Sequence, residues 1–449
     1  MELIKITPEL MRNAINNREF KKLRTWFDEY NIVDLAQVVD HLELIDLLPL
    51  FKILNKEVGG ELFSYLDNET VEKLTHSLDE NTLKNILEQL YLDDLSDILS
   101  ELPDNLVKKV LGSVSSELRK DINTLLSYPE NSCGSIMSVD FVTLREDYTV
   151  VQALRSVRRQ GRMAETINWV YVSDPKGTLV GYLPLKELLL APEDAQIVDL
   201  MDSDVIYVTT LDDQETAAKL ISKYDLTAIP VTDTQRNILG IITVDDILDI
   251  VEEEATEDIH KMAAITPIEG SYLDASLKTM VRSRITWLLV LMISATFTGS
   301  IINANANLLV HFSSLAVFIP MLMDTSGNAG SQATAMVIRG ITVDDLSYKD
   351  FFKIFWKEFG VSLLLGAVLF VINTLRIGLL MDAGWMMAVL VSMTVFLTIT
   401  MANLVGGLLP LFALIIKQDP AAMAAPLITT ICDALALLTY FAIAGAFLR

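Results

Sequence analysis

Residues 245–264 read DDILDIVEEEATEDIHKMAA, and they predict one long helix because Ile247, Ile250 and Val251 recur at helical spacing. The chain has 449 residues, of which those before this helix look soluble and those after about residue 280 look membrane-embedded. Apolar residues make up 51% of the chain, and the mean hydropathy of +0.39 is high for a soluble protein. The helix therefore connects a soluble half to a membrane half.

The connecting helix is acidic along one side, which we call the acidic stripe. It contains carboxylates at the i, i+3 and i+4 spacing, Asp246, Asp249, Glu253 and Glu257, with Glu254 and Asp258 beside them. Such a stripe repels itself, and the first basic residue of the helix is Lys261. Divalent cations would relieve the repulsion, so the stripe could act as a switch that clamps domains together when the ion is abundant. The alternative is a solvated acidic helix that binds no ligand.

Downstream of the connecting helix, apolar runs predict five membrane spans, since a spanning helix needs about 20 such residues. Asp, Glu, Lys and Arg are all absent from Ile285 to Met323, a run that is too long for one span and is interrupted by the polar turn at 303–307. The predicted spans cover about 285–302, 310–338, 359–380, 383–416 and 420–448.

The basic residues that flank these spans predict the orientation of the chain. Seven of them fall on one side of a five-span arrangement: Arg282, Arg284, Arg339, Lys349, Lys353, Lys357 and Lys417. The other side receives only Arg376 and Arg449. Because basic loops stay in the cytosol, and because no signal peptide is recognisable, we expect a multi-pass protein with a cytosolic soluble half and the C-terminus outside.

Two carboxylates fall inside the predicted spans, where an ionisable group is costly and usually marks a pathway. Asp433 lies roughly 20 Å along a helix from Pro420, near mid-membrane, with no basic residue near it in sequence. Asp324 lies in PMLMDTSGNAGSQATA, a small and polar stretch that could line a wet pore or pack closely against another helix. A cation is the obvious partner of Asp433. The alternative is a protonated carboxyl that bonds to a neighbouring helix.

Residues 20–128 are rich in leucine at helical spacing. A leucine recurs every 12 residues, at Leu66, Leu78, Leu90 and Leu102. Asp67 and Asp79 follow two of these leucines as helix starts would, so we predict short antiparallel helices stacked into an all-α superhelix. Asp93 and Asp97 share a helix face, where like charges destabilise the helix unless a ligand neutralises them. Glu61 is a further surface carboxylate.

Residues 133–251 contain a repeat of another kind. One copy begins at Ile136 and the other at Leu200, and each predicts strand, helix, strand, turn, strand and helix. This order resembles a tandem pair of CBS domains, an α/β module. In the second copy, GIITVDD at 240–246 resembles the CBS segment that contacts ribose and phosphate, whereas the first copy departs from it at Pro184 and Glu187. We therefore expect at most one nucleotide site, with the candidate residues Thr243, Asp246, Ala228 and Pro230.

The available ligands are hard oxygen atoms. The histidines are scattered, and neither Cys133 nor Cys432 has a partner at metal-ligand spacing, which disfavours zinc and copper and leaves magnesium or calcium. Magnesium keeps its waters and is usually held by one or two carboxylates, so one Asp433 per subunit of a homodimer suits a hydrated magnesium ion. The net charge of −24 disfavours nucleic acid as a partner, and the chain has no P-loop motif.

From about residue 20 to its end, the chain resembles the MgtE family of magnesium transporters. The matching motifs are EEEATEDI at 252–259, PMLMDTSGNAGSQ at 320–332 and DPAAMAAPLITTICD at 419–433. The resemblance implies an acidic helical domain at 1–130, tandem CBS domains at 131–244, a connecting plug helix at 245–270 and a transmembrane domain of five helices at 271–449. It implies a homodimeric channel, not an enzyme, that takes up magnesium across the cell membrane and closes when cytosolic magnesium is high.

The resemblance also implies roles for single residues. Asp433 matches the pore carboxylate that holds hydrated magnesium, and the pore-lining candidates are Asn328, Asp324, Thr429 and Thr430. The plug-helix sensor positions are Asp246, Asp249, Glu254, Glu257 and Asp258. The sensor carboxylates of the CBS pair are Asp213, Glu215 and Asp225, and those of the N-terminal domain are Glu61, Asp93 and Asp97. Some family members bind ATP in the CBS pair, so ATP is a possible ligand beside Mg²⁺.

Two other interpretations remain open. The chain could be a membrane-anchored nucleotide sensor whose spans only dimerise, in which case it would bind ATP without any ion flux. It could also be a CBS-regulated anion channel, although the spans lack the basic residues that line anion pores. Ion flux itself distinguishes the first of these interpretations from a magnesium channel.

Overall fold

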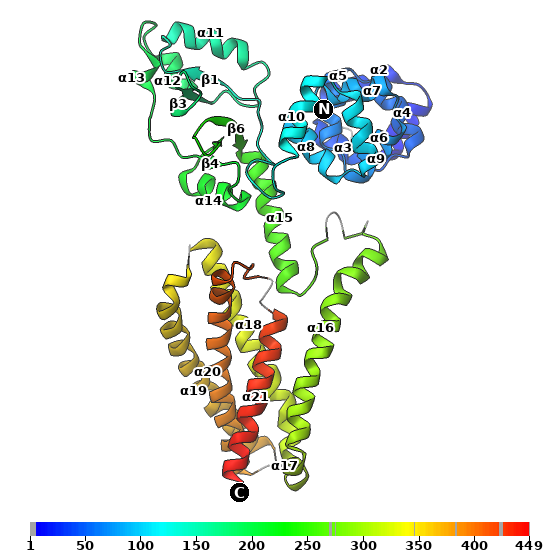
Figure 1. The fold of residues 1–449 in the computed structure, drawn as a ribbon. Coiled ribbons are helices and arrows are strands. Elements are labelled where there is room, and N and C mark those ends of the chain that lie inside the picture. Colours follow the sequence, from blue (N-terminus) through cyan, green and yellow to red (C-terminus); the bar gives the residue numbers. More distant parts are fainter. Residues whose placement is uncertain are drawn as a thin grey trace. The chain divides into compact units, whose positions relative to one another are not determined.

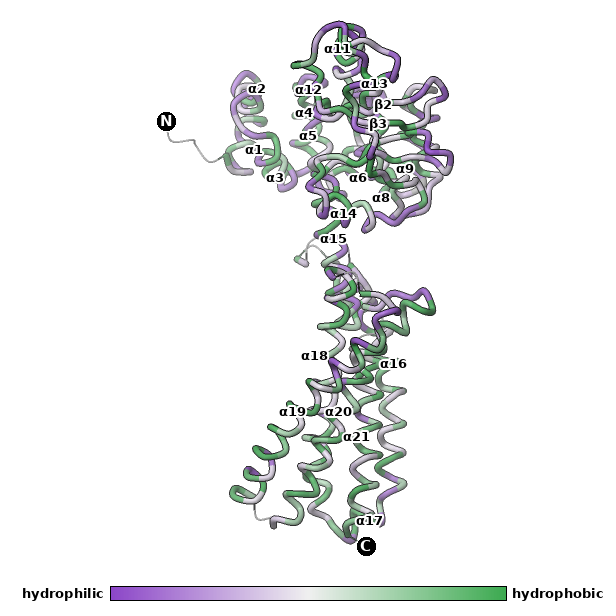
Figure 2. Tube along the Cα trace, turned by 90° about the vertical axis from the view of Figure 1, so that its left-hand side faces the viewer, coloured by the Kyte–Doolittle hydropathy of each residue, from purple (hydrophilic) through white to green (hydrophobic). Residues whose placement is uncertain are grey.

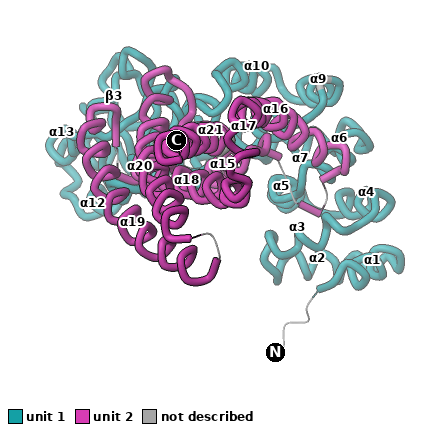
Figure 3. The backbone as a smooth tube through the Cα atoms, turned by 90° about the horizontal axis from the view of Figure 1, so that it is seen from below, with its two compact units in different colours: residues 1–251 teal, residues 252–449 magenta. Residues whose placement is uncertain are grey.

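The computed structural model describes residues 6–268, 272–273, 275–344, 346–381, 384–421 and 425–448. The chain forms two compact units, residues 1–251 and residues 252–449, which Figure 3 distinguishes by colour. Figure 1 shows the succession of helices and strands along the chain. The two units are described in turn.

The first unit begins with ten short helices between Pro8 and Leu125. They are α1 (Pro8–Asn16), α2 (Phe20–Glu29), α3 (Ile32–Asp40), α4 (Leu44–Ile53), α5 (Lys56–Ser64), α6 (Asn68–Ser77), α7 (Glu80–Leu87), α8 (Leu92–Glu101), α9 (Asp104–Ser113) and α10 (Ser116–Leu125). Helices two places apart pack together, as α3 does with α5, α5 with α7 and α7 with α9. This stacking confirms the predicted all-α superhelix.

The 12-residue leucine repeat marks the boundaries of the short helices. Leu78 and Leu102 are the C-terminal cap residues of α6 and α8, and both are buried. Asp67 and Asp79 cap the N-termini of α6 and α7, where a carboxylate oxygen of each accepts the backbone N–H three residues further on, at 2.7 and 3.0 Å. The helix starts that the sequence predicts at these aspartates are therefore confirmed.

The tandem CBS pair follows the superhelix and consists of two three-stranded sheets. The first copy contains β1 (Thr143–Arg145), α11 (Val150–Gln160), β2 (Trp169–Ser173), β3 (Leu179–Pro184), α12 (Leu185–Leu190) and α13 (Ile197–Leu200); the second contains β4 (Val208–Thr209), α14 (Gln214–Tyr224), β5 (Ala228–Thr232), β6 (Ile238–Thr243) and α15 (Val244–Met262). In each sheet the first strand pairs in parallel with the second, and the second pairs antiparallel with the third. The register shifts at equivalent places, Val172/Ser173 and Val231/Thr232, which confirms the predicted repeat.

After the end of α15, the described residues of the second unit form five long helices and a few short ones. They are α16 (Leu277–Ala304), α17 (Ala306–His311), η1 (Ser313–Phe318), α18 (Ile319–Val343), η2 (Tyr348–Asp350), α19 (Phe351–Leu380), α20 (Trp385–Ile415) and α21 (Ala425–Phe447). The helix α18 packs against α20 and α21, and α16 packs against α21. Figure 2 shows the apolar colour that dominates the long helices of this unit.

Four helical segments among the described residues are long and apolar enough to cross a membrane: Leu277–Ala304, Tyr348–Leu380, Trp385–Ile415 and Leu427–Phe447. The helix α18 has 25 residues, and its polar stretch from Asp324 to Gln332 makes it less apolar than these four. It also begins later than the predicted second span at 310–338, because the chain runs through α17 and η1 before Pro320 opens α18.

The helices α18 and α20 meet backbone to backbone at two glycines. A side chain on Gly406 of α20 would overlap the carbonyl oxygen of Gly330 in α18. Pro410 has no N–H, so it leaves the carbonyl of Gly406, four residues earlier in α20, without its helical partner. The Thr334 hydroxyl of α18 donates to this carbonyl at 2.8 Å. The contact fixes α18, which carries Asp324 and Asn328, against its neighbour.

The variant Gly406→Ala should destabilise the second unit, because the added methyl group would collide with backbone rather than with a flexible side chain. The cost should be about 1–3 kcal/mol, measured as a lower melting temperature of the full-length protein in detergent. Gly360→Ala is the matched control, since a Cβ at Gly360 in α19 meets nothing within 4 Å and alanine favours a helix. Equal melting temperatures for Gly406→Ala and the wild type would contradict this view of the crossing.

Candidate functional site

Three carboxylates from distant parts of the first unit converge on one point, and we call them the carboxylate cluster. Asp93 is in the first turn of α8, Glu165 is in the segment between α11 and β2, and Asp246 is in the first turn of α15. One oxygen atom of each lies within 4.8 Å of the other two. Asp93 is buried, with 7% of its surface exposed, and Glu165 and Asp246 are half-buried. Folding therefore concentrates negative charge at a place with little water.

Burial and mutual repulsion change the acidity of these groups. Burial first, and then the charges of Glu165 and Asp246, raise the pKa of Asp93 to about 8. Burial likewise raises the pKa of Asp246 to about 6, and it raises the pKa of Asp94, the residue after Asp93, to about 6. Burial also raises the pKa of Glu165. Near neutral pH the carboxylate cluster therefore retains a proton at Asp93, and a bound cation would favour the fully ionised form.

The hydrogen bonds around the carboxylate cluster leave oxygen atoms available. The Thr243 hydroxyl, at the end of β6, lies 2.6 Å from an oxygen of Asp246 and 2.9 Å from an oxygen of Glu165. The other oxygen of Glu165, Oε2, is buried and accepts no hydrogen bond from the part of the chain that the structure describes. Carboxylate and hydroxyl oxygens are the ligands that Mg²⁺ and Ca²⁺ prefer. The residues present therefore fit a hard divalent cation.

The structure places the other predicted sensor residues apart from this cluster. Glu61 on α5 and Asp97 on α8 are exposed. Asp213 caps the N-terminus of α14 by accepting the backbone N–H of Glu215 at 2.9 Å, and the Glu215 side chain pairs with Lys219. Asp225 ends α14 in the left-handed conformation with φ of 52°, so these three residues also have local structural roles. Along α15, Asp249 is exposed, and Glu254, Glu257 and Asp258 are half-buried.

In the second unit, Asp433 of α21 lies against the small face of α18. A Cβ on Gly327 would lie 3.7 Å from an oxygen of Asp433 and 3.6 Å from the methyl group of Thr429. The contact thus brings Asp433 and Thr429 of α21 to Gly327, and Thr430 is the next residue of α21. Glycine at 327 lets the two helices approach each other closely beside the carboxylate. Elsewhere on α18, the amide of the exposed Asn328 donates to the carboxylate of the exposed Asp324, one turn earlier, at 3.2 Å.

An open pocket of about 670 Å³ lies on the first CBS copy, with one lining residue, Thr227, from the second copy. Its lining residues are Asn168, Trp169, Pro184, Leu185, Lys186, Leu189, Leu190 and Thr227. The Trp169 indole N–H donates to the Thr227 hydroxyl at 2.5 Å and so links the copies. An aromatic ring and a lysine at one pocket suit a base and a phosphate. The four residues predicted to bind a nucleotide lie elsewhere: Thr243 and Asp246 at the carboxylate cluster, and Ala228 and Pro230 buried in β5.

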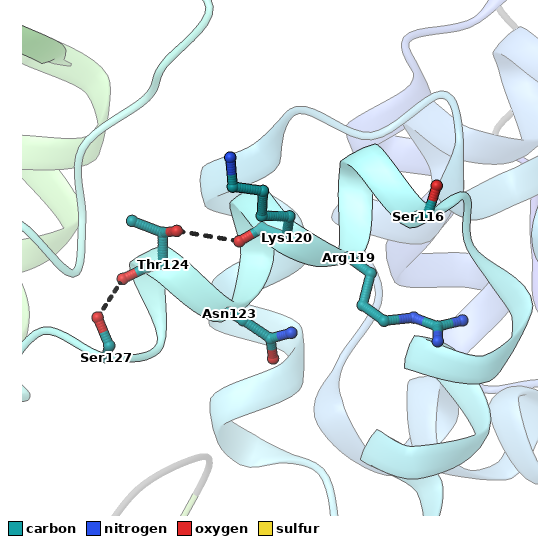
Figure 4. Close-up of a pocket in the computed structure, with 6 residues that line it drawn as sticks. All are labelled: Ser116, Arg119, Lys120, Asn123, Thr124 and Ser127. Atoms are coloured by element: carbon teal, nitrogen blue, oxygen red, sulfur yellow. Dashed lines mark hydrogen bonds between the residues drawn. The ribbon is translucent and has the colours of Figure 1, made fainter.

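A second pocket, of about 420 Å³, lies along α10 and is shown in Figure 4. Its lining residues are Ser116, Arg119, Lys120, Asn123, Thr124 and Ser127. The hydroxyl groups of Thr124 and Ser127 donate to the carbonyls of Lys120 and Thr124. This lining offers the positively charged Arg119 and Lys120 and no carboxylate, and its Thr124 and Ser127 hydroxyl groups already donate hydrogen bonds. The pocket is therefore unsuited to a cation.

Three family models match the chain. The model described as a divalent cation transporter, MgtE, matches residues 319–443; the MgtE intracellular N domain matches 30–131; and the CBS domain matches 133–194 and 197–253. The chain is 37% identical over 332 residues to the magnesium transporter MgtE of Thermus thermophilus, covering 74% of this chain and 73% of that protein. It is 35% identical over 341 residues to the magnesium transporter MgtE of Bacillus subtilis, covering 76% and 74%.

Two solved structures resemble the soluble half. One is the soluble part of a magnesium transporter, with a TM-score of 0.52 and 32% identity, covering 55% of this chain and 98% of that chain. The other is the cytosolic domain of the Mg²⁺ channel MgtE in complex with ATP, with a TM-score of 0.52 and 33% identity, covering 54% and 99%. Both agree with a helical N-terminal domain joined to a CBS pair.

The carboxylate cluster predicts how stability depends on pH. The pKa of Asp93 rises from 3.8 to about 8 on folding, so the folded protein binds this proton more tightly and the free energy of unfolding falls as pH rises from about 4 to about 8. Each pKa unit corresponds to about 1.4 kcal/mol. In the presence of a chelator, Asp93→Asn should therefore lose less stability than the wild type between about pH 5 and about pH 8.

The measurement is the melting temperature of the full-length protein in EDTA across this pH range. Glu57→Gln is the matched control, because Glu57 is an exposed carboxylate on α5. If the melting temperatures of the wild type and of Asp93→Asn change with pH in the same way, a raised pKa of Asp93 is contradicted.

Proposed function

This chain belongs to the MgtE family of magnesium transporters, and we propose that it is a magnesium channel whose cytosolic carboxylates close it when internal magnesium is high. The observation that carries the proposal is the position of Asp433. It lies in a helix that is apolar enough to cross a membrane, beside Gly327 of α18, the helix that also carries Asp324 and Asn328. A carboxylate there is tolerable if a cation passes beside it.

The ion and its driving force follow from the ligands. Magnesium sheds its waters reluctantly and is usually held by one or two carboxylates, so Asp433 from each subunit of a homodimer suits a hydrated ion on the dimer axis. A membrane potential that is negative inside favours inward movement by about 2.3 kcal/mol per charge for each 100 mV. In this proposal the channel lies in the cell membrane, with residues 1–280 in the cytosol and the C-terminus outside.

Closure would use the carboxylates of the soluble half. Magnesium at the carboxylate cluster would join α8 of the superhelix, the first CBS copy and the start of α15, because one ligand comes from each. Further ions would neutralise the acidic stripe along the rest of α15. Since α15 leads to the first span, ordering this helix could close the pore. Glu165 adds a ligand from the first CBS copy that the sequence pattern did not reveal.

Nucleotide binding is a second candidate function for the CBS pair. It is favoured by the pocket that Trp169 and Lys186 line, and a similar cytosolic domain was solved in complex with ATP. In this proposal ATP modulates the channel. A protein that bound ATP but carried no ions would instead be a membrane-anchored sensor.

Conduction should depend on the charge of Asp433. Asp433→Asn keeps the size of the side chain but removes its charge, so it should abolish Mg²⁺ uptake into proteoliposomes, because the hydrated ion would lose its carboxylate partner. Asp350→Asn is the matched control, since Asp350 pairs with the exposed Lys353 outside the helix interiors; it should conduct as the wild type does. Persistent Mg²⁺ flux through Asp433→Asn would refute the pore assignment.

Closure should depend on the carboxylates of α15 and of the carboxylate cluster. Neutralising Asp249, Glu254 and Glu257 together, or changing Glu165→Gln alone, should leave maximal uptake intact but raise the internal Mg²⁺ concentration that halves uptake, by about fivefold or more. Magnesium should also protect the soluble half of the wild type from protease, and less so in these variants.

The matched control for Glu165→Gln is Glu193→Gln, which changes an exposed glutamate of the same CBS copy. The triple variant and Glu165→Gln could both be inhibited by internal Mg²⁺ as the wild type is, and magnesium could fail to protect the wild type from protease. These two results together would count against a magnesium-operated switch.

A further inference from the structure

One lysine joins the last turn of α15 to the turn that precedes α21. The Lys261 Nζ atom lies 2.6 Å from an oxygen of Glu257, one turn earlier in α15, and 2.6 Å from Oδ2 of Asp419. The three side chains are between 25% and 35% exposed, so the contact is partly withdrawn from water. Both partners of Lys261 belong to the second unit.

Asp419 also stabilises the turn that follows α20. Its other oxygen, Oδ1, accepts the backbone N–H of Ala421 at 2.7 Å, and Ala421 is buried, with 1% of its surface exposed. The chain has just left α20 through Lys417, which is in the left-handed conformation with φ of 56°. Lys261 therefore bonds to a defined turn, and α21, the helix of Asp433, begins at Ala425.

A second contact holds the chain just beyond α15. The backbone N–H of Thr266 donates to the carbonyl of Ser283 in α16 at 2.9 Å, and Ser283 is buried. This bond ties α15 only to the helix that follows it in sequence. The Lys261 contact reaches the other end of the transmembrane segment, 158 residues further along the chain.

The chemistry of the contact favours a strong link. The Lys261 ammonium group lies 2.6 Å from each of two carboxylates, so both contacts are ion pairs with charge-assisted hydrogen bonds. Charge-assisted bonds are stronger than neutral ones, and partial burial reduces screening by salt. The Lys353–Asp350 pair, whose lysine is 85% exposed, is an ordinary surface pair by comparison.

We propose that Lys261 is a positioning residue for closure, a latch that holds α15 to the turn leading into the Asp433 helix. The inference rests on the proposed function, because it requires α15 to be the element that closes the channel. Ordering of the acidic stripe by magnesium is then transmitted through Lys261 and Asp419 to the start of α21. The lysine itself binds neither the transported ion nor the regulatory ions.

The test is Mg²⁺ uptake by full-length protein in proteoliposomes at a series of internal Mg²⁺ concentrations. Lys261→Met keeps the length of the side chain and removes its charge; its maximal uptake should stay within about twofold of the wild type, and the half-inhibitory internal Mg²⁺ should rise about fivefold or more. Lys261→Arg should keep normal inhibition. The exchange Lys261→Glu with Asp419→Lys should restore it, because an ammonium group again lies between two carboxylates.

Lys353→Met is the matched control and should behave as the wild type does. An unchanged half-inhibitory concentration in Lys261→Met would overturn the latch, and so would a lower one, which would mean that the lysine only competes with Mg²⁺ for the carboxylates. If Lys261→Met fails to fold, the exchanged pair decides: a folded protein that is no longer inhibited overturns the inference. If internal Mg²⁺ inhibits the wild type and Lys261→Met equally, the latch alone is refuted. If internal Mg²⁺ does not inhibit the wild type, closure by magnesium is refuted as well.

Discussion

Carboxylates that are held close together and away from water repel one another, and a proton or a cation must compensate for this repulsion. The constraint operates in both units. In the first, Asp93, Glu165 and Asp246 place oxygen atoms within 4.8 Å of one another. In the second, Asp433 is a carboxylate within a helix that is apolar enough to cross a membrane. Carboxylate oxygens are ligands that a hard divalent cation prefers, so in our proposal one ion serves both as cargo and as signal.

The fold was largely predictable because its determinants are local. Helix caps such as Asp67 and Asp79, the 12-residue leucine spacing and the two CBS copies all act over short stretches of sequence. The exception is α18. Its polar face reduces its apolar signal, and the chain first passes through two short helices, so its start at Ile319 departs from the predicted span. A helix with a polar face is poorly described by hydropathy alone.

The candidate sites were only partly predictable, because they are assembled by tertiary contacts. Asp93 and Asp246 lie on helices whose acidic periodicity singles them out. Glu165 stands alone between α11 and β2, with no spacing that would mark it, and only the folded chain brings it to the other two. The pocket at Trp169 and Lys186 likewise uses an aromatic residue and a base from strand and helix ends, away from the segment that the CBS resemblance indicates.

The most direct test of the central claim is amide hydrogen exchange of the full-length protein with and without Mg²⁺. If the ion binds the carboxylate cluster, exchange should slow in α8 and in the first turns of α15, since both supply ligands, and this protection should be lost in Glu165→Gln. The superhelix far from the cluster, around α1 and α2, should exchange equally in both conditions. Identical exchange of α8 and α15 at all Mg²⁺ concentrations would contradict the account.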